Sequence, residues 1–296
     1  MAAKNLRCGV SIRDFGAFNA PRTRAWLREV VPLSYSGFLG RAIFGLVITA
    51  QGLLAFGLIT LGVIVSKWRA APSVTLPLVF VELRRSGLRL IPMFAFMSAA
   101  LGFAVIGQAV TQLSKYGATS MFLGNIMVLA VVRELGPLFT AMLVLSRSGT
   151  ANVIELGTAR AQGEVEALEA LGVDPIHYFV MPRVIGMALG VFSLTIYFIM
   201  GALLSGYLWA FLQDVPLGPG DYFKQLADSL TVLDFVILAV KSSFFGIAIA
   251  VITCYHGLAQ PLQLEDVSRA TIGAVAQSII ACVLLDAVFI LLYILI

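Results

Sequence analysis

Long apolar runs that contain no charged residue alternate with short polar stretches along this chain. Each run approaches or exceeds the roughly 20 residues that a helix needs to cross a bilayer. The pattern predicts an all-α integral membrane protein. The uncharged runs are Ala42–Ser66, Leu90–Ser114, Val184–Gln213, Ser242–Leu264 and Ala270–Leu285.

The first run, Ala42–Ser66, is the ambiguous one. Basic residues lie on both sides of it, before Arg41 and again between Lys67 and Arg89. Because positive charge gathers on the cytoplasmic side, both stretches fit only if this run does not cross. We therefore favour an interfacial or re-entrant helix over a sixth span. Five transmembrane helices are then expected, at Leu90–Leu113, Thr119–Leu145, Phe179–Leu212, Leu233–Tyr255 and Ala270–Ile296.

This topology divides the chain into a cytoplasmic tail (1–40), an interfacial or re-entrant region (41–89) and a five-helix transmembrane domain (90–296). With the N-terminus in the cytoplasm, the loop Asp214–Thr231 is expected outside. The stretches Ser146–Tyr178 and His256–Arg269 are expected in the cytoplasm.

Composition supports a membrane protein, since 59% of residues are hydrophobic and only 12% are charged. An ordinary soluble domain is about a quarter charged. The net charge of +4 does not indicate nucleic-acid binding, because the basic residues flank the apolar runs. The isolated His177 and His256 lack neighbouring ligands, so we expect no metal site.

One charged segment, Ala151–Leu171, interrupts the spans. Its apolar residues recur at spacings of three and four, which predicts a single amphipathic helix of about five turns. Gly172 and Asp174-Pro175 end it. A solvated loop helix is one interpretation. We favour a helix whose apolar stripe docks in a protein groove, because its acids would be repelled by anionic lipid.

Four ionisable residues lie within the spans: Arg133, Glu134, Lys241 and Asp286. Charges in lipid need a partner or a wet cavity. Arg133 and Glu134 point about 100° apart, so Glu134 should find a cation on another helix, such as Lys241 or Arg133 of a second copy. The cluster could hold the helices together or line a lipid path, and we favour the structural role. Pro137 frees a carbonyl and could kink its helix.

Several short motifs together resemble the MlaE/YrbE permeases, the membrane subunits of MCE-associated ABC transporters. The resemblance implies an elbow helix, five transmembrane helices and a coupling helix that docks on an ATPase. Ala159 and Gly163-Glu164 depart from the family pattern. The motifs are Glu134-Leu-Gly-Pro137, Arg147-x-Gly149, Glu155-Leu-Gly-Thr158, Glu166-Ala-Leu-Glu169, Gly172-Val-Asp-Pro175, Pro182-Arg183, Lys241-Ser242, Phe245-Gly246, Tyr255-x-Gly257, Ser268-Arg269-Ala270-Thr271 and Asp286.

On this resemblance, the residues expected to couple to the ATPase are Glu155, Gly157, Gln162, Glu164, Val165, Glu166, Leu168, Glu169 and Asp174. The intramembrane set comprises Arg133, Glu134, Pro137, Lys241 and Asp286.

The resemblance also implies a transport subunit of a bacterial inner membrane rather than an enzyme. The expected partners are an ABC ATPase, an MCE-domain lipid-binding protein, a second copy of the chain and phospholipid. The chain has no G-x-x-x-x-G-K-[ST] phosphate loop, so ATP and Mg²⁺ should bind the partner ATPase. We expect this chain to bind no cofactor itself. A secondary transporter or a non-transporting scaffold is the alternative; no inverted repeat supports the former.

Overall fold

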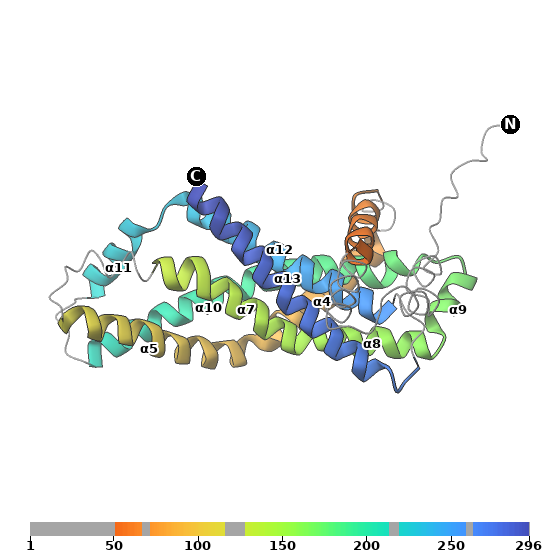
Figure 1. Cartoon of the computed structure of the whole chain (residues 1–296), viewed down its shortest axis with the longest axis horizontal. Coiled ribbons are helices and arrows are strands. Elements are labelled where there is room, and N and C mark those ends of the chain that lie inside the picture. The colour runs from red at the N-terminus through yellow and green to blue at the C-terminus, as the bar shows by residue number, and fades with distance from the viewer. Residues whose placement is uncertain (1–50, 67–71, 116–127, 213–218, 259–262, 296) are drawn as a thin grey trace, which may run out of the picture.

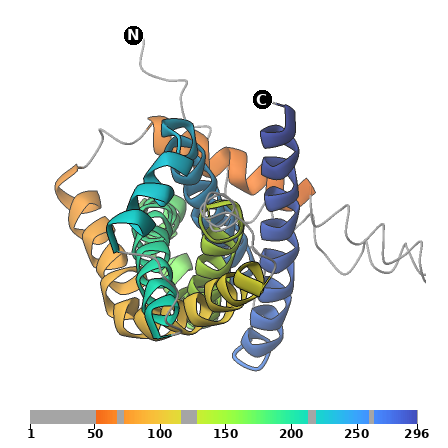
Figure 2. The same ribbon diagram turned by 90° about the vertical axis from the view of Figure 1, so that its left-hand side faces the viewer.

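In the computed structural model, residues 51–66, 72–115, 128–212, 219–258 and 263–295 are described, and all regular structure among them is helical. Five of these helices are long and apolar enough to cross a membrane, which confirms the predicted class and number of spans. Most of them run lengthwise through the molecule, whereas the C-terminal one crosses the others obliquely (Figures 1 and 2). Their apolar stretches are Ile91–Ala109, Val128–Ala161, Ile176–Trp209, Val232–Leu258 and Val267–Leu295.

The elements follow one another as helices of α, 3-10 and π type. In chain order they are α4 (Pro72–Ser86), the 3-10 turn η1 (Leu88–Leu90), α5 (Ile91–Lys115), the π-helix η2 (Val128–Leu135), α7 (Gly136–Val144), the π-helix η3 (Leu145–Gly149), α8 (Thr150–Ala161), α9 (Glu164–Ala170), the π-helix η4 (Ile176–Val180), α10 (Met181–Leu212), α11 (Pro219–Ser229), α12 (Val232–Leu258) and α13 (Val267–Leu295).

Helix α10 is the centre of the bundle, because it packs against α4, α5, α7 and α12. Phe198 of α10 meets Phe94 of α5 edge to face, with ring centroids 6.1 Å apart. Nearby, a Cβ added to Gly102 of α5 would collide with the Ser205 hydroxyl and the Ala202 carbonyl of α10. Small residues let the two backbones approach closely, as is usual where membrane helices pack.

The described part of the apolar run Ala42–Ser66 is the short helix Gln51–Ser66. It runs crosswise to the long helices (Figures 1 and 2). Phe56 is buried against Tyr255 of α12, at a centroid distance of 5.7 Å, whereas Leu58 on the other side is 69% exposed. This orientation supports the interfacial prediction, which stays a prediction. Residues 42–50 lie outside the described part of the chain.

Between α10 and α12 the structure has a helix, α11, that the sequence pattern did not predict. It lies at the end of the bundle opposite α9 (Figure 1). Tyr222 is buried there and donates a hydrogen bond from its hydroxyl to the Leu203 carbonyl, at 3.0 Å. Burial raises the pKa of Tyr222. This anchor fixes α11 on the end of α10.

The single helix predicted for Ala151–Leu171 is wrong. Helix α8 continues the preceding span without interruption and ends at Ala161, and α9 begins at Glu164. Gly163 between them has φ of +79°, a left-handed conformation that favours glycine. Gly172 adopts the same φ just after α9. The periodic pattern is preserved through the break, so periodicity alone did not reveal it.

We predict that Gly102→Val destabilises the helix bundle by roughly 1–3 kcal/mol or more, because the added carbons overlap the α10 backbone. Thermal unfolding in detergent, followed by circular dichroism, measures the effect. Gly62→Val is the matched control, since a Cβ there meets nothing within 4 Å. Equal unfolding temperatures for the two variants would contradict the close approach.

Candidate functional site

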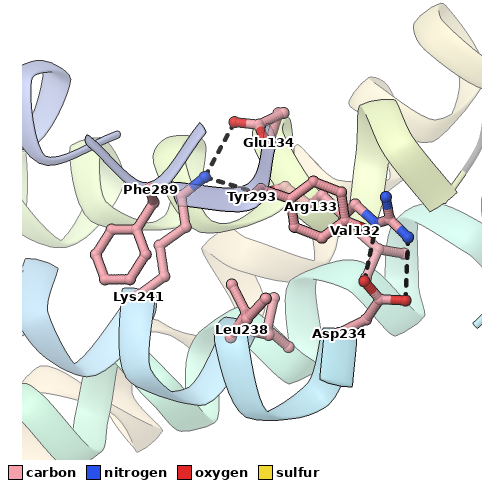
Figure 3. A pocket seen from close by; sticks show the side chains of 9 residues that line it. Val132, Arg133, Glu134, Asp234, Leu238, Lys241, Phe289 and Tyr293 are labelled. Atoms are coloured by element: carbon pink, nitrogen blue, oxygen red, sulfur yellow. Dashed lines mark hydrogen bonds and ion pairs between the residues drawn. The ribbon is translucent and has the colours of Figure 1, made fainter. Parts of the chain in front are cut away.

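Charged side chains from three helices meet between the spans and form what we call the intramembrane cluster. Its members are Arg133 and Glu134 of η2, Asp234 and Lys241 of α12, and Asp286 of α13. The structure therefore brings together all four charged residues that the sequence singled out within the spans. Figure 3 shows Lys241 pointing toward Glu134 and Arg133 pointing toward Asp234.

Lys241 is the central cation and is only 2% exposed. Its Nζ lies 3.0 Å from Glu134 Oε2 and 2.7 Å from Asp286 Oδ1, and it donates to the Arg133 carbonyl at 2.9 Å. The contacts with Glu134 and the Arg133 carbonyl are hydrogen bonds, and the contact with Asp286 is an ion pair. Glu134 thus meets a cation on another helix, the first of the two cations expected from the sequence.

The carbonyl that Lys241 contacts belongs to Arg133, four residues before Pro137. Pro137 has no N–H, and in an α-helix its donor would have served the carbonyl four residues earlier, that of Arg133. The helix is π-type over Val128–Leu135 and becomes α-helical at Gly136. In a low-dielectric environment a freed carbonyl needs another donor. Lys241 donates to the Arg133 carbonyl close to this change from π- to α-helix.

Arg133 turns away from Glu134 toward the start of α12. Its Nε lies 2.9 Å from Asp234 Oδ1, and its Nη2 donates to Oδ2 at 3.2 Å. The guanidinium also lies over the Tyr293 ring, 4.3 Å from the centroid. The backbone N–H and hydroxyl of Thr231 both donate to Asp234.

Sequence reasoning missed Asp234, which is 4% exposed and neutralises Arg133. A signal was present: Thr231 and Asp234 are three residues apart just before an apolar run, which is the pattern of a capping box. Tyr293 was also missed, and no pattern in the sequence marks it.

The pocket bordered by this cluster is small. Its volume is about 20 Å³, enough for a water molecule but not for a lipid headgroup. Both cations already have carboxylate partners, so the geometry in this state is that of a structural ion-pair network. Glu134, with 33% of its side chain exposed, is the most accessible carboxylate of the intramembrane cluster. Among the described residues, no three potential metal ligands lie together.

The residues expected to contact an ATPase divide into buried and accessible ones. Gly157 and Val165 are buried inside the chain, and Val165 packs in the same core as Leu156 and Val180. These two positions of the apolar stripe therefore face the permease itself, which corrects the expectation for Gly157 and Val165, whereas Ile154 on the same stripe is 49% exposed. Glu155 is also engaged internally, with Arg85 and Arg183.

The accessible part of the segment is α9 and the turns around it. Gln162, Glu164 and Glu166 are exposed, and the Glu166 carboxylate lies 3.3 Å from Arg160 across the Gly163 break. Leu168, Glu169 and Asp174 are half-buried, and Asp174 accepts a hydrogen bond from the Ile176 N–H at 3.0 Å. Asp174 thus caps the following helix.

Comparison with known proteins assigns a family. The family model described as Permease MlaE matches residues 79–292. A probable ABC transporter permease protein of Rickettsia felis is 30% identical over 77% of this chain and 87% of its own length. The Arabidopsis thaliana chloroplast protein trigalactosyldiacylglycerol 1 is 31% identical, over 70% of this chain and 59% of its own. A Synechocystis probable ABC transporter permease is 34% identical, over 61% and 68%.

We predict that Lys241→Met costs about 3–5 kcal/mol of stability, because it leaves Glu134 and Asp286 without their cation. Unfolding in detergent measures the loss. Adding Glu134→Gln and Asp286→Asn to the same chain should recover much of it, whereas Lys224→Met on α11 should change nothing. A stable Lys241→Met protein would show that the network does not hold the helices together.

Proposed function

Because the chain belongs to the MlaE permease family, we propose that it is the transmembrane subunit of an ABC transporter that moves phospholipid or a related lipid between membranes. The family match covers four of the five spans completely and most of the fifth. Relatives that align over most of this chain carry the name probable ABC transporter permease protein. The Arabidopsis relative is named after a glycolipid, which favours lipid as the substrate class.

The surface around α9 is the observation that carries the proposal. Leu171 is 79% exposed and Val173 38% exposed, next to the exposed acids Glu164 and Glu166. Acids are repelled by anionic headgroups, so a protein groove with a basic rim suits this surface better than a membrane does. We assign that groove to an ATPase, which binds ATP and Mg²⁺. The N-terminus and α9 are then cytoplasmic, in a bacterial inner membrane.

The remaining partners follow from the exposed faces. Helix α13 is mostly exposed along its apolar length, and a second copy is proposed to cover part of it. An odd number of spans makes repetition within one chain awkward, so a homodimer is the natural transport unit. The MCE-domain protein would meet the opposite end of the bundle, where α11 lies (Figure 1).

The proposal is tested by purifying the chain with its ATPase and identifying the bound lipids by mass spectrometry. After reconstitution into vesicles, transfer of labelled phospholipid should depend on ATP. ATP hydrolysis that is insensitive to lipid, with no transfer, would favour the scaffold alternative. Transfer driven by an ion gradient without ATP would favour a secondary transporter.

We predict that Glu164→Lys with Glu169→Lys weakens ATPase binding at least about tenfold, or 1.4 kcal/mol, by reversing charge at one exposed and one half-buried position of α9. Binding of the purified ATPase to permease in detergent measures the change. Asp228→Lys, an exposed charge reversal on α11 at the other end of the bundle, is the control. Unaltered binding by the double variant would place the ATPase elsewhere.

We predict that Glu134→Ala lowers the rate of lipid transfer more than it lowers assembly, because Glu134 is the accessible carboxylate of the intramembrane cluster. Lys241 keeps Asp286 as a counter-ion in this variant, so the bundle should persist. Transfer is measured per assembled complex, with assembly quantified by gel filtration. Normal transfer by a normally assembled complex would remove Glu134 from the lipid path.

A further inference from the structure

A second charge cluster lies where α4, α8 and α10 meet, remote from the intramembrane one. It consists of Glu82 and Arg85 of α4, Glu155 of α8 and Arg183 of α10, and we call it the α4–α8–α10 cluster. None of the functions argued above uses Glu82, Arg85 or Arg183. Helix α8 leads directly into the Gly163 break and α9, so this cluster lies at the base of the proposed ATPase contact.

One carboxylate in this cluster holds both arginines. Arg85 donates from Nη1 to Glu155 Oε2 at 2.6 Å and from Nη2 to Oε1. Arg183 donates from Nη2 to Glu155 Oε2 at 3.1 Å. Glu155 therefore ties α8 to α4 and α10 at once. Moving α8 relative to these helices would separate both pairs.

Glu82 is the second carboxylate of the cluster, and neither arginine forms an ion pair with it. It is 7% exposed, and its Oε1 is buried without a hydrogen-bond partner. The Nε of Arg183 is likewise buried without a hydrogen-bond acceptor. A buried donor and a buried acceptor that both lack a hydrogen bond are uncommon in a folded protein.

The two unused groups lie on facing helix surfaces. Glu82 is three residues before Arg85 on α4, and its Cβ and Cγ cover Gly186, three residues after Arg183 on α10. Residues three apart share one helix face. Burial raises the pKa of Glu82, while the charges of Arg183 and Arg85 lower it. Both guanidiniums are thus neighbours of a second, unused carboxylate.

We propose that Glu82 is a positioning residue that accepts Arg183 and Arg85 in a second state of the permease, when α8 moves with α9 and Glu155 withdraws. The exchange keeps each guanidinium paired in both states, so the movement leaves no arginine without a counter-ion. Ion pairs that are remade at a helix interface are a known way to give a protein two discrete arrangements. The inference rests on the proposed function, because the ATPase supplies the movement of α9.

The test is Glu82→Gln in the permease–ATPase complex, reconstituted in vesicles with labelled phospholipid. The substituted amide keeps the shape of the side chain and loses its charge, so the unfolding temperature should stay or rise. Lipid transfer should fall at least about fivefold. The kcat of lipid-stimulated ATP hydrolysis should fall with it, while the KM for ATP stays unchanged. Glu82→Asp should restore part of the transfer, and Glu265→Gln, exposed before α13, should behave like wild type.

The outcomes separate this inference from the function on which it rests. Absence of ATP-dependent lipid transfer by the wild-type complex overturns both. Wild-type transfer matched by Glu82→Gln overturns the partner exchange alone. A variant that loses stability and transfer in equal measure also overturns it, since that result describes a purely structural carboxylate.

Discussion

The ammonium group of Lys241 is buried where η2, α12 and α13 meet, and the register of these three helices depends on its neutralisation. A charge in a low-dielectric interior is costly unless it is paired and fully hydrogen-bonded. Two carboxylates and one backbone carbonyl provide this pairing. Sliding one helix by a single turn, about 5.4 Å, would separate the groups. The cluster therefore selects one packing of helices whose apolar surfaces alone would permit several.

A single helical rod connects the two charge clusters. Glu134 and Glu155 both belong to the uninterrupted stretch Val128–Ala161, and about 30 Å separates them along its axis at 1.5 Å per residue. Each carboxylate pairs with cations on other helices, Lys241 at one level and Arg85 with Arg183 at the other. A displacement of this stretch along its axis would thus disturb the ion pairs of both clusters. The π-helical segments η2 and η3 lie within it.

The sequence was sufficient for the number of spans, because charge-free runs of this length are rare outside a membrane. It narrowed the partner of Glu134 to two cations, because lipid leaves a carboxylate few alternatives, and the packing selects Lys241. It was insufficient for Val165, whose helical spacing is the same whether the residue faces a partner or its own core. The break at Gly163 depends on a backbone dihedral that periodicity does not report. Glu155 pairs with arginines 70 and 28 residues away, and such contacts are products of the packing.

The left-handed glycines at positions 163 and 172 give α9 an independence that its neighbours lack. Each glycine redirects the chain without relying on contacts beyond its own turn, since a Cβ at either position meets nothing within 4 Å. The intervening helix is fastened to the rest mainly by Val165 and by the Arg160–Glu166 pair. Substitutions at its outward-facing residues should therefore leave the packing of the membrane bundle unchanged.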